Sequence, residues 1–455
     1  MRPVPLTRRA LLVLTAAVLV PGVPALAATA ITPRVRRTPL GLGRTVASLG
    51  AAQLLGVTWT SGEARVQVRW RIAAGWSAWE AVEQDVEPGE RVRGTEPLWP
   101  PRGASAVELQ VGGAPAALAL VRVNDGPAPR SWGTASASAA ERHPLLGLVN
   151  RRADWGADES KRSGSPDYAS TVEAVVVHHT AGSNDYTQAD VPRRIRADYA
   201  YHVDARGWSD LGYNLVVDRF GGIWVGRAGG LGRATIGAHA AGFNTATLGV
   251  SLLGDMTRER PTDEAVRAFS RVTAYAAATW RFDPRSAVTL TSRGGPRYAA
   301  GTRVTLPRVF GHTDVGRTAC PGALMDRLDD IRTGAVALLG PAPRITDVQV
   351  TGAPVRAPEP VVITGTLNRS APWTVALRDG DGTVVARSAG ESASPRLEWN
   401  GLRPVPGTEA GGIVPALVPA AAGSYRWAIA VDDGYHPAAR REDDVEVALP
   451  VVPAG

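Results

Sequence analysis

The chain is poor in sulfur and almost devoid of lysine. It holds one cysteine, Cys320, and three methionines in 455 residues. A single cysteine excludes an internal disulfide, so this thiol must be buried, reactive or bound to something. Lys161 is the only lysine, and the remaining basic charge is arginine. Because no cluster of basic residues is interleaved with aromatics, we expect no nucleic-acid partner.

Long apolar runs are also scarce. The one near the start, residues 10–20, follows a basic segment and precedes the small-residue sequence Ala-Leu-Ala at 25–27. This pattern is typical of a secretory signal peptide over residues 1–27, and the run is too short for a bilayer, which needs about 20 residues. The Arg8-Arg9 pair resembles a twin-arginine signal, and the general secretory route also stays open. We expect a secreted or cell-wall protein without a transmembrane segment.

The charge is mildly basic. The formal net charge is +7, and residues 1–27 contain three arginines and no acids, which leaves about +4 for the rest (7 − 3). Such an excess suits an anionic cell wall. A chain of 455 residues predicts two to four domains. We expect it to be a monomer.

Residues 38–125 show short runs of alternating apolar and polar residues, separated by glycine and proline turns. This period-2 pattern predicts an N-terminal β-sandwich domain. Trp70, Trp76 and Trp79 fall within it, and they could either stack against sugars or pack in the core. Residues 126–142 are rich in Gly, Pro, Ser and Ala, which predicts a linker.

Residues 143–340 mix strands with helices. An apolar run at 172–178 predicts a buried strand. Asp190 with Pro192 predicts the start of a helix that ends near Gly207, and two more helices are expected at about 262–280 and 324–338. Strands mixed with helices imply an α/β layer fold with a mixed sheet. Residues 341–455 return to short alternating runs, which predict a second β-sandwich of immunoglobulin-like size.

The stretch GHTDVGRTACPG at 311–322 carries His312 and Cys320. Imidazole nitrogen and thiolate are both ligands of zinc. A third ligand is available in the VVVHHTAG stretch at 175–182, where a strand would direct His178 and His179 to opposite faces, so that only one of them can face Cys320. Three protein ligands and an open fourth position are typical of a catalytic zinc site.

The central domain resembles the superfamily of peptidoglycan-recognition proteins and type-2 amidases, which includes the T7 lysozyme-like amidases. Five motifs carry the resemblance in order along about 190 residues: RADWGA at 152–157, VHHTAG at 177–182, GWSDLGYN at 207–214, GAHAAGFN at 237–244, and GHTDV with TACPG at 311–322. The C-terminal segments LEWNG at 397–401, AGSYRW at 422–427 and VDDG at 431–434 are similar to the immunoglobulin-like module of flagellar-hook assembly proteins.

The resemblance implies a zinc site formed by His178, His312 and Cys320. It implies that Tyr213 hydrogen-bonds the oxyanion that forms on the scissile amide, although a tyrosine on a strand also packs in cores. Thr318 matches a position that carries lysine in phage enzymes and threonine in many amidases of the family. Its hydroxyl would either serve catalysis or satisfy a local turn.

Other polar residues in the motifs suit supporting roles. We expect Asp314 to orient the ligand loop, His179 to be structural, and His202 and His239 to be structural or, for His239, to line the substrate groove. The chain also departs from the family pattern at Thr313 and in the segment at 227–231, which leaves the stem-peptide preference open.

The sequence therefore predicts a secreted zinc-dependent N-acetylmuramoyl-L-alanine amidase that acts on peptidoglycan. One alternative is a non-catalytic peptidoglycan-binding protein, although such proteins typically lack the cysteine ligand. Another is a cysteine hydrolase with Cys320 as nucleophile, but an exported lone thiol is prone to oxidation. We further expect residues 143–340 alone to retain the chemistry on soluble muropeptides.

Overall fold

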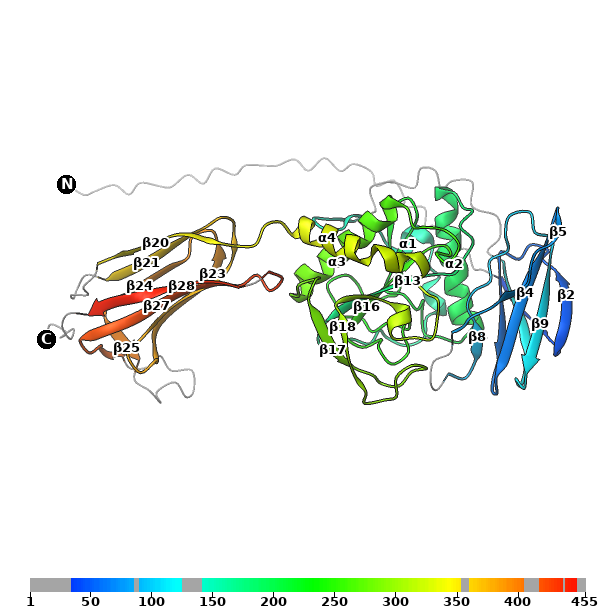
Figure 1. Ribbon diagram of the computed structural model, residues 1–455, viewed down its shortest axis with the longest axis horizontal. Helices are drawn as coiled ribbons and strands as arrows, with labels where there is room; N and C mark the ends of the chain where they lie inside the picture. The colour runs from blue at the N-terminus through cyan, green and yellow to red at the C-terminus, as the bar shows by residue number, and fades with distance from the viewer. Residues whose placement is uncertain are drawn as a thin grey trace, which may run out of the picture.

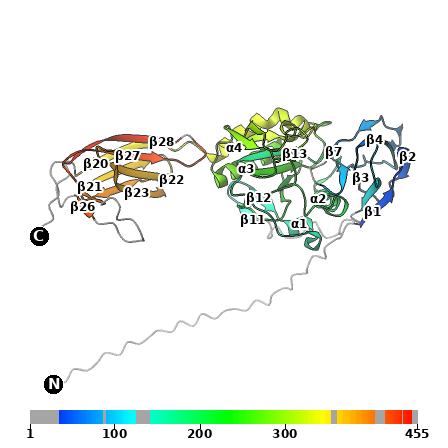
Figure 2. The same cartoon turned by 90° about the horizontal axis from the view of Figure 1, so that it is seen from below.

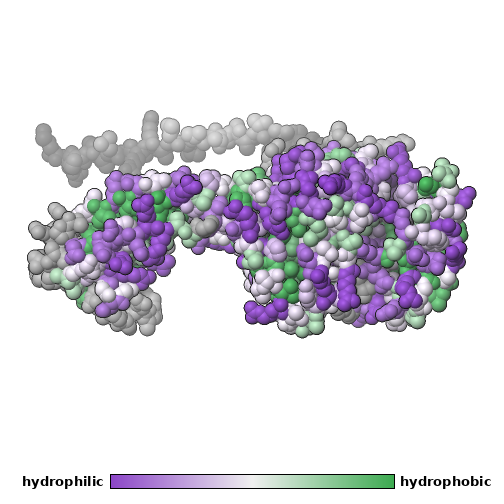
Figure 3. Space-filling view, in the orientation of Figure 1, coloured by the Kyte–Doolittle hydropathy of each residue, from purple (hydrophilic) through white to green (hydrophobic). Residues whose placement is uncertain are grey.

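The computed structural model describes residues 34–85, 90–124, 141–352, 360–404, 417–436 and 438–447. A central α/β domain lies between two β domains (Figures 1 and 2). Hydrophilic residues predominate on the face of the central domain seen in Figure 3. Within the described part of the chain, no helix is long and apolar enough to cross a membrane. The predicted signal peptide, and all but the last residues of the predicted linker, lie outside the described residues.

The N-terminal β domain, which we take as the described residues of 34–124, consists of two sheets that share one apolar core. It begins at Arg34, four residues before the predicted start, because β1 pairs along its whole length with β10. One sheet has the order β1-β10-β3-β8-β7: Arg34–Pro39, Ala119–Asn124, Leu54–Trp59, Arg93–Thr95 and Gln84–Asp85. The other has the order β2-β9-β4-β5, with β6 beside β4: Gly43–Ser48, Ala106–Gly113, Ala64–Ile72, Gly75–Trp76 and Glu80–Ala81.

Trp70, Trp76 and Trp79 do not form one platform. Trp70 lies on β4 with its side chain in the core, 6 % exposed. Its neighbour on the same strand, Arg69, faces the other way and stacks on both Trp76 and Trp79. The alternation of side chains along a strand therefore separates Trp70 from the other two.

The central domain is built on a seven-stranded mixed sheet. Its order is β11-β12-β15-β14-β16-β13-β19: Glu141–His143, Gly147–Asn150, Ile223–Val225, Leu215–Val217, Thr247–Leu252, Ala174–His179 and Val309–Gly311. β13 pairs in parallel with both β16 and β19. β14 is parallel to β16 and antiparallel to β15. A separate hairpin of β17 and β18, Ala287–Thr291 and Arg303–Pro307, packs below β19.

Helices cover both faces of this sheet: α1 at Arg152–Trp155, α2 at Val191–Ala200, α3 at Asp263–Trp280 and α4 at Leu328–Leu339. The Thr262 hydroxyl accepts the Ala265 N–H and caps α3, as Ser and Thr do at helix starts. α2 continues as a π-turn at Tyr201–Ala205, and the chain turns at Gly207 with φ +76°, where an αL residue ends the helical stretch.

Alternation along β13 decides which of its side chains can reach a site. Val175 and Val177 pack into the core formed with α3 and α4. Ala174 and Val176 pack on the opposite face, against Phe310 and the β17–β18 hairpin. Because successive side chains alternate, His178 belongs to the second face, and this places it beside the loop that follows β19.

The C-terminal β domain again encloses one core between its sheets. Its strands are β20 to β28: Ile345–Thr351, Val361–Leu367, Ala371–Arg378, Val384–Ser392, Arg396–Trp399, Leu402–Pro404, Leu417–Pro419, Gly423–Val431 and Ala439–Val447. The Arg281 guanidinium of the central domain donates a hydrogen bond to the Asp432 carbonyl of this domain, at 2.9 Å.

The N-terminal β domain is joined to the central domain by a buried interface. Leu54, Val121 and Val123 from its sheet form one apolar cluster with the end of α2 and the π-turn, in which Tyr201 is fully buried. The Tyr201 hydroxyl donates to the Thr95 carbonyl at 2.7 Å. Apolar burial of this kind is the main favourable term in association, so the two domains form one packed unit.

Candidate metal centre

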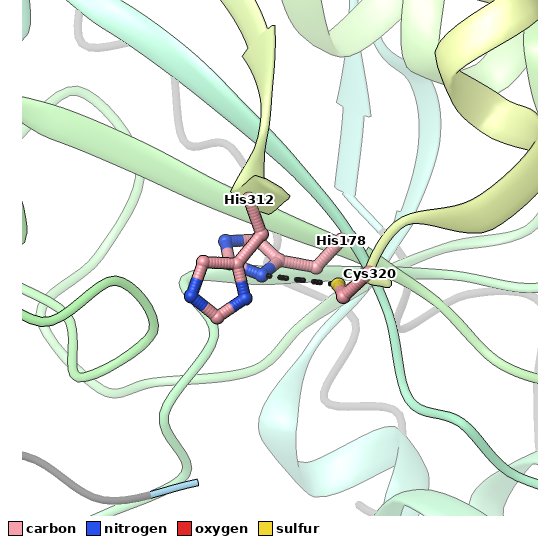
Figure 4. Close-up of side chains that lie close together, drawn as sticks. All are labelled: His178, His312 and Cys320. Atoms are coloured by element: carbon pink, nitrogen blue, oxygen red, sulfur yellow. Dashed lines mark hydrogen bonds between the residues drawn. The ribbon is translucent and has the colours of Figure 1, made fainter. Parts of the chain in front are cut away.

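Three potential ligands from two distant segments of the chain converge at one point. His178 lies near the end of β13, His312 opens the 3₁₀ turn after β19, and Cys320 follows in the same loop (Figure 4). Their ligand atoms all lie within 4.8 Å of one another. His178 Nδ1 lies 3.7 Å from Cys320 Sγ, and the rings of His178 and His312 have centroids 4.6 Å apart.

This donor set suits zinc. Zinc bonds of about 2.0–2.3 Å in a tetrahedron separate neighbouring ligand atoms by roughly 3.5 Å, which is close to the distance between His178 Nδ1 and Cys320 Sγ. Two imidazoles and one thiol are the borderline-soft ligands that zinc prefers. Burial lowers the pKa of His178 well below its ordinary value, and the nearby His312 and His239 lower it further. His178 is therefore neutral, as a metal ligand must be.

His239 contacts the other side of the His178 ring. Its Nδ1 lies 3.0 Å from His178 Nε2, so that His178 Nδ1 is left directed toward Cys320. Histidines that bind metals usually hold a second partner through the other ring nitrogen. Burial first, and then His312 and Arg227, lower the pKa of His239 to about 3. Of the two roles that the sequence leaves open for His239, structural or lining the substrate groove, this contact agrees with the structural one.

His179 and Asp314 hold the surrounding loops. His179 Nδ1 accepts the Met256 N–H at 2.9 Å on the face of β13 opposite to His178, and the His179 N–H donates to Cys320 Sγ at 3.3 Å. The Asp314 carboxylate accepts the Gly311 N–H at 2.9 Å and closes the turn that carries His312. Both residues thus have the structural roles that we expected.

Tyr213 lies beside the candidate ligands. Its ring centroid is 5.4 Å from that of His178 and 5.9 Å from that of His202. His202 in turn stacks on Trp208, with centroids 4.4 Å apart, and its Nδ1 accepts the Gly212 N–H at 3.3 Å. His202 therefore contacts both Trp208 and Tyr213 and helps to hold the Tyr213 ring in place.

Thr318 has contacts that the sequence did not predict. Its hydroxyl donates to the carboxylate of Glu83, which belongs to the N-terminal β domain. The same carboxylate accepts the Ala319 N–H at 2.7 Å. Glu83 lies outside every motif of the central domain, so nothing in the local sequence marks it.

A cleft of about 890 Å³ opens between the N-terminal β domain and the central domain, next to the loop of Cys320. One wall carries Trp70, Glu80 and Glu83, and the other carries Asp255, Arg258 and Ala319. A volume of this size is within the range of ligand sites.

The fold and the site together define an α/β domain with a candidate metal centre at the ends of its parallel strands. Residues 168–323 match the family model of N-acetylmuramoyl-L-alanine amidase. Peptidoglycan recognition protein 1 of Bos indicus is 34% identical over 177 residues, which are 39% of this chain and 79% of that protein. Peptidoglycan-recognition protein SC2 of Drosophila simulans is 29% identical over 179 residues, which are 39% of this chain and 83% of that protein.

Among solved structures, wild-type PGRP-LB of Drosophila aligns at 26% identity and a TM-score of 0.32, over 40% of this chain and 92% of that one. The two curated relatives named above are matched over 79% and 83% of their length, at 34% and 29% identity. The chain therefore belongs to the superfamily of peptidoglycan recognition proteins and type-2 amidases, through its central domain.

Proposed function

We propose that this protein is a secreted zinc-dependent N-acetylmuramoyl-L-alanine amidase. Its reaction is hydrolysis of the amide between the lactyl group of N-acetylmuramic acid and L-alanine in peptidoglycan. The observation that carries the proposal is the convergence of His178, His312 and Cys320 beside Tyr213. The match of residues 168–323 to the amidase family supports the same reaction.

His178, His312 and Cys320 would hold the zinc ion. When bound, zinc at such a site polarises the amide carbonyl and lowers the pKa of water toward about 7. His239 keeps His178 in the orientation that directs Nδ1 to the site. Tyr213 donates its hydroxyl proton to the oxygen on which negative charge develops, where a single donor is worth several kcal/mol.

The remaining parts of the proposal concern the whole chain. Residues 1–27 act as the export signal, the protein acts in the cell wall as a monomer, and the two flanking domains are a β-sandwich and an immunoglobulin-like module. The domains that we propose are 38–125, 143–340 and 341–455, with the first extended to Arg34. The substrate partner is peptidoglycan.

A second candidate function is binding of peptidoglycan without hydrolysis. The names of the relatives favour it, since both are called recognition proteins. The two functions differ in one observable, the release of new L-alanine amino termini from muropeptides.

The decisive experiment measures that release together with the zinc content of the same samples. We expect about one zinc per chain, loss of activity on chelation, and recovery on adding zinc, because the ligands survive removal of the metal. Tight binding of fragments without any release would establish a recognition protein. Activity that resists chelation and is lost on alkylation of Cys320 would instead make this residue a nucleophile.

A further inference from the structure

The loop that carries Cys320 is contacted by a residue 235 positions earlier in the chain. Glu83 receives two hydrogen bonds from this loop, one from the Thr318 hydroxyl and one from the Ala319 N–H at 2.7 Å. Both donors stand within two residues of Cys320. The carboxylate is half-buried, and a charged acceptor makes such hydrogen bonds stronger than neutral ones.

The contact continues to the candidate ligand itself. Because the Thr318 hydroxyl gives its proton to Glu83, its oxygen is free to accept, and the Cys320 N–H donates to it at 3.0 Å. A chain of hydrogen bonds thus runs from Glu83 through Thr318 to the backbone of Cys320. Hydrogen bonds linked in this way polarise and strengthen one another.

Glu83 is held in place by the interface between the two domains. Besides the apolar cluster around Tyr201, Arg206 pairs with Glu90 at 2.7 Å, and their side chains are only 0 % and 10 % exposed. Glu90 also accepts the Trp208 indole N–H at 2.5 Å. The Glu83 carbonyl itself accepts the Glu96 N–H at 3.0 Å, which ties the backbone of Glu83 to the same domain.

We propose that Glu83 is a positioning residue, through which the N-terminal β domain fixes the Cys320 loop in the geometry that binds metal. Its effect on turnover rests on the proposed amidase function, whereas its effect on metal affinity does not. The same contacts assign Thr318 to this hydrogen-bonded chain, since its hydroxyl proton is engaged by Glu83 and is not offered to a substrate.

The test compares Glu83→Ala with Glu80→Ala in the full chain. Glu80 is the matched control, because it pairs with Arg258 across the same interface and touches neither Thr318 nor Ala319. We expect Glu83→Ala to weaken zinc binding 10- to 100-fold in a chelator competition, the range for partners of metal ligands. Glu80→Ala should stay within about threefold of wild type, as surface ion pairs are worth little.

A second measurement uses the metal-free protein. Cys320 is 1 % exposed, so its alkylation requires the loop to open. We expect Glu83→Ala to speed alkylation at least tenfold over Glu80→Ala and wild type. Glu83→Gln, which keeps an acceptor for the Ala319 N–H, should restore most of both properties.

Equal zinc affinity and equal alkylation rates in Glu83→Ala and Glu80→Ala would overturn the proposal. If Glu83→Ala fails to fold, Glu83→Gln is compared with Thr318→Val, which breaks the hydrogen-bonded chain. Equally weak zinc binding in the two proteins would contradict the proposal, because the acceptor oxygen that Glu83→Gln keeps would then be irrelevant. If Glu83→Ala is alkylated faster than Glu80→Ala as expected, but the wild-type protein hydrolyses nothing, the amidase function is refuted and the role of Glu83 stands.

Discussion

At the scale of the residue, Tyr213 separates an enzyme from a binding protein. Its ring lies beside that of His178, which makes its hydroxyl a candidate oxyanion donor. Tyr213→Phe removes one oxygen and little volume, so folding and zinc content should persist. We expect turnover on muropeptide to fall by about 10²–10³, while binding of fragments changes far less, because in the proposed reaction the hydroxyl acts in the transition state. Unchanged turnover in an active protein would show that Tyr213 only packs.

His202 gives the stability of the protein a dependence on pH. Burial, followed by the charges of Arg206 and Arg227, lowers the pKa of His202 to about 3. The unfolded chain, with a pKa near 6.5, binds the proton first as the pH falls. The contribution of neutral His202 to the stability of the fold is therefore fully present above about pH 6.5 and is lost progressively as the pH falls toward 3.

The corresponding measurement is urea unfolding at pH 7 and pH 5. Wild type should lose about 2 kcal/mol more than His202→Asn over this interval, since asparagine does not titrate and can still accept the Gly212 N–H. An equal loss in both proteins would show that His202 takes up no proton on unfolding.

At the scale of the element, strand β16 shapes the candidate metal centre because one of its residues, Gly249, has no side chain. A Cβ at Gly249 would lie 2.3 Å from the ring of His239, which is closer than any side chain tolerates. Because Gly249 has no side chain, His239 can reach His178. Asn214 ties β16 to the neighbouring strand by accepting the Gly249 N–H at 2.8 Å.

Gly249→Ala should move His239 away from His178 and weaken zinc binding by about tenfold, with about 1–3 kcal/mol of overpacking. Gly112→Ala is the control, because a Cβ at Gly112 meets nothing within 4 Å. Chelator competition and thermal unfolding of both variants test this. Wild-type zinc affinity in Gly249→Ala would mean that His239 does not orient the ligand.

At the scale of the whole molecule, the two flanking domains are attached differently. The N-terminal β domain buries Tyr201 and the end of α2, whereas the C-terminal β domain meets the central domain around Arg281 and Asp432. Removing the first would expose an apolar surface and release Glu83 from the Cys320 loop. This changes the expectation that residues 143–340 alone retain the chemistry on soluble muropeptides.

We expect a chain that ends at residue 340 to keep the zinc affinity, unfolding temperature of the central domain and activity on soluble muropeptide. A chain that begins at residue 143 should bind zinc more weakly, unfold at lower temperature and aggregate more readily, as exposed apolar patches promote association. Calorimetry and zinc titration of the two truncated proteins provide the measurement. Full zinc affinity in the chain that begins at 143 would contradict a structural role of the N-terminal domain.

The sequence by itself determined the local elements and the candidate ligands. Alternation predicted that His178 and His179 point apart, and Asp190 and Gly207 marked the ends of one helix, because these signals act over a few neighbouring residues. Because His312 and Cys320 stand in one short stretch of the sequence, the sequence alone predicted that they share a site. The motif that carries Tyr213 placed it near that site through resemblance.

Only the tertiary structure decided which residues support the ligands. The approach of His239 to His178 depends on Gly249, on a third segment of the chain. The contact of Glu83 with Thr318 depends on how two domains pack through the cluster around Tyr201. Such contacts leave no periodic or spaced pattern, because they arise from the surface shapes of folded units and not from the order of neighbouring residues.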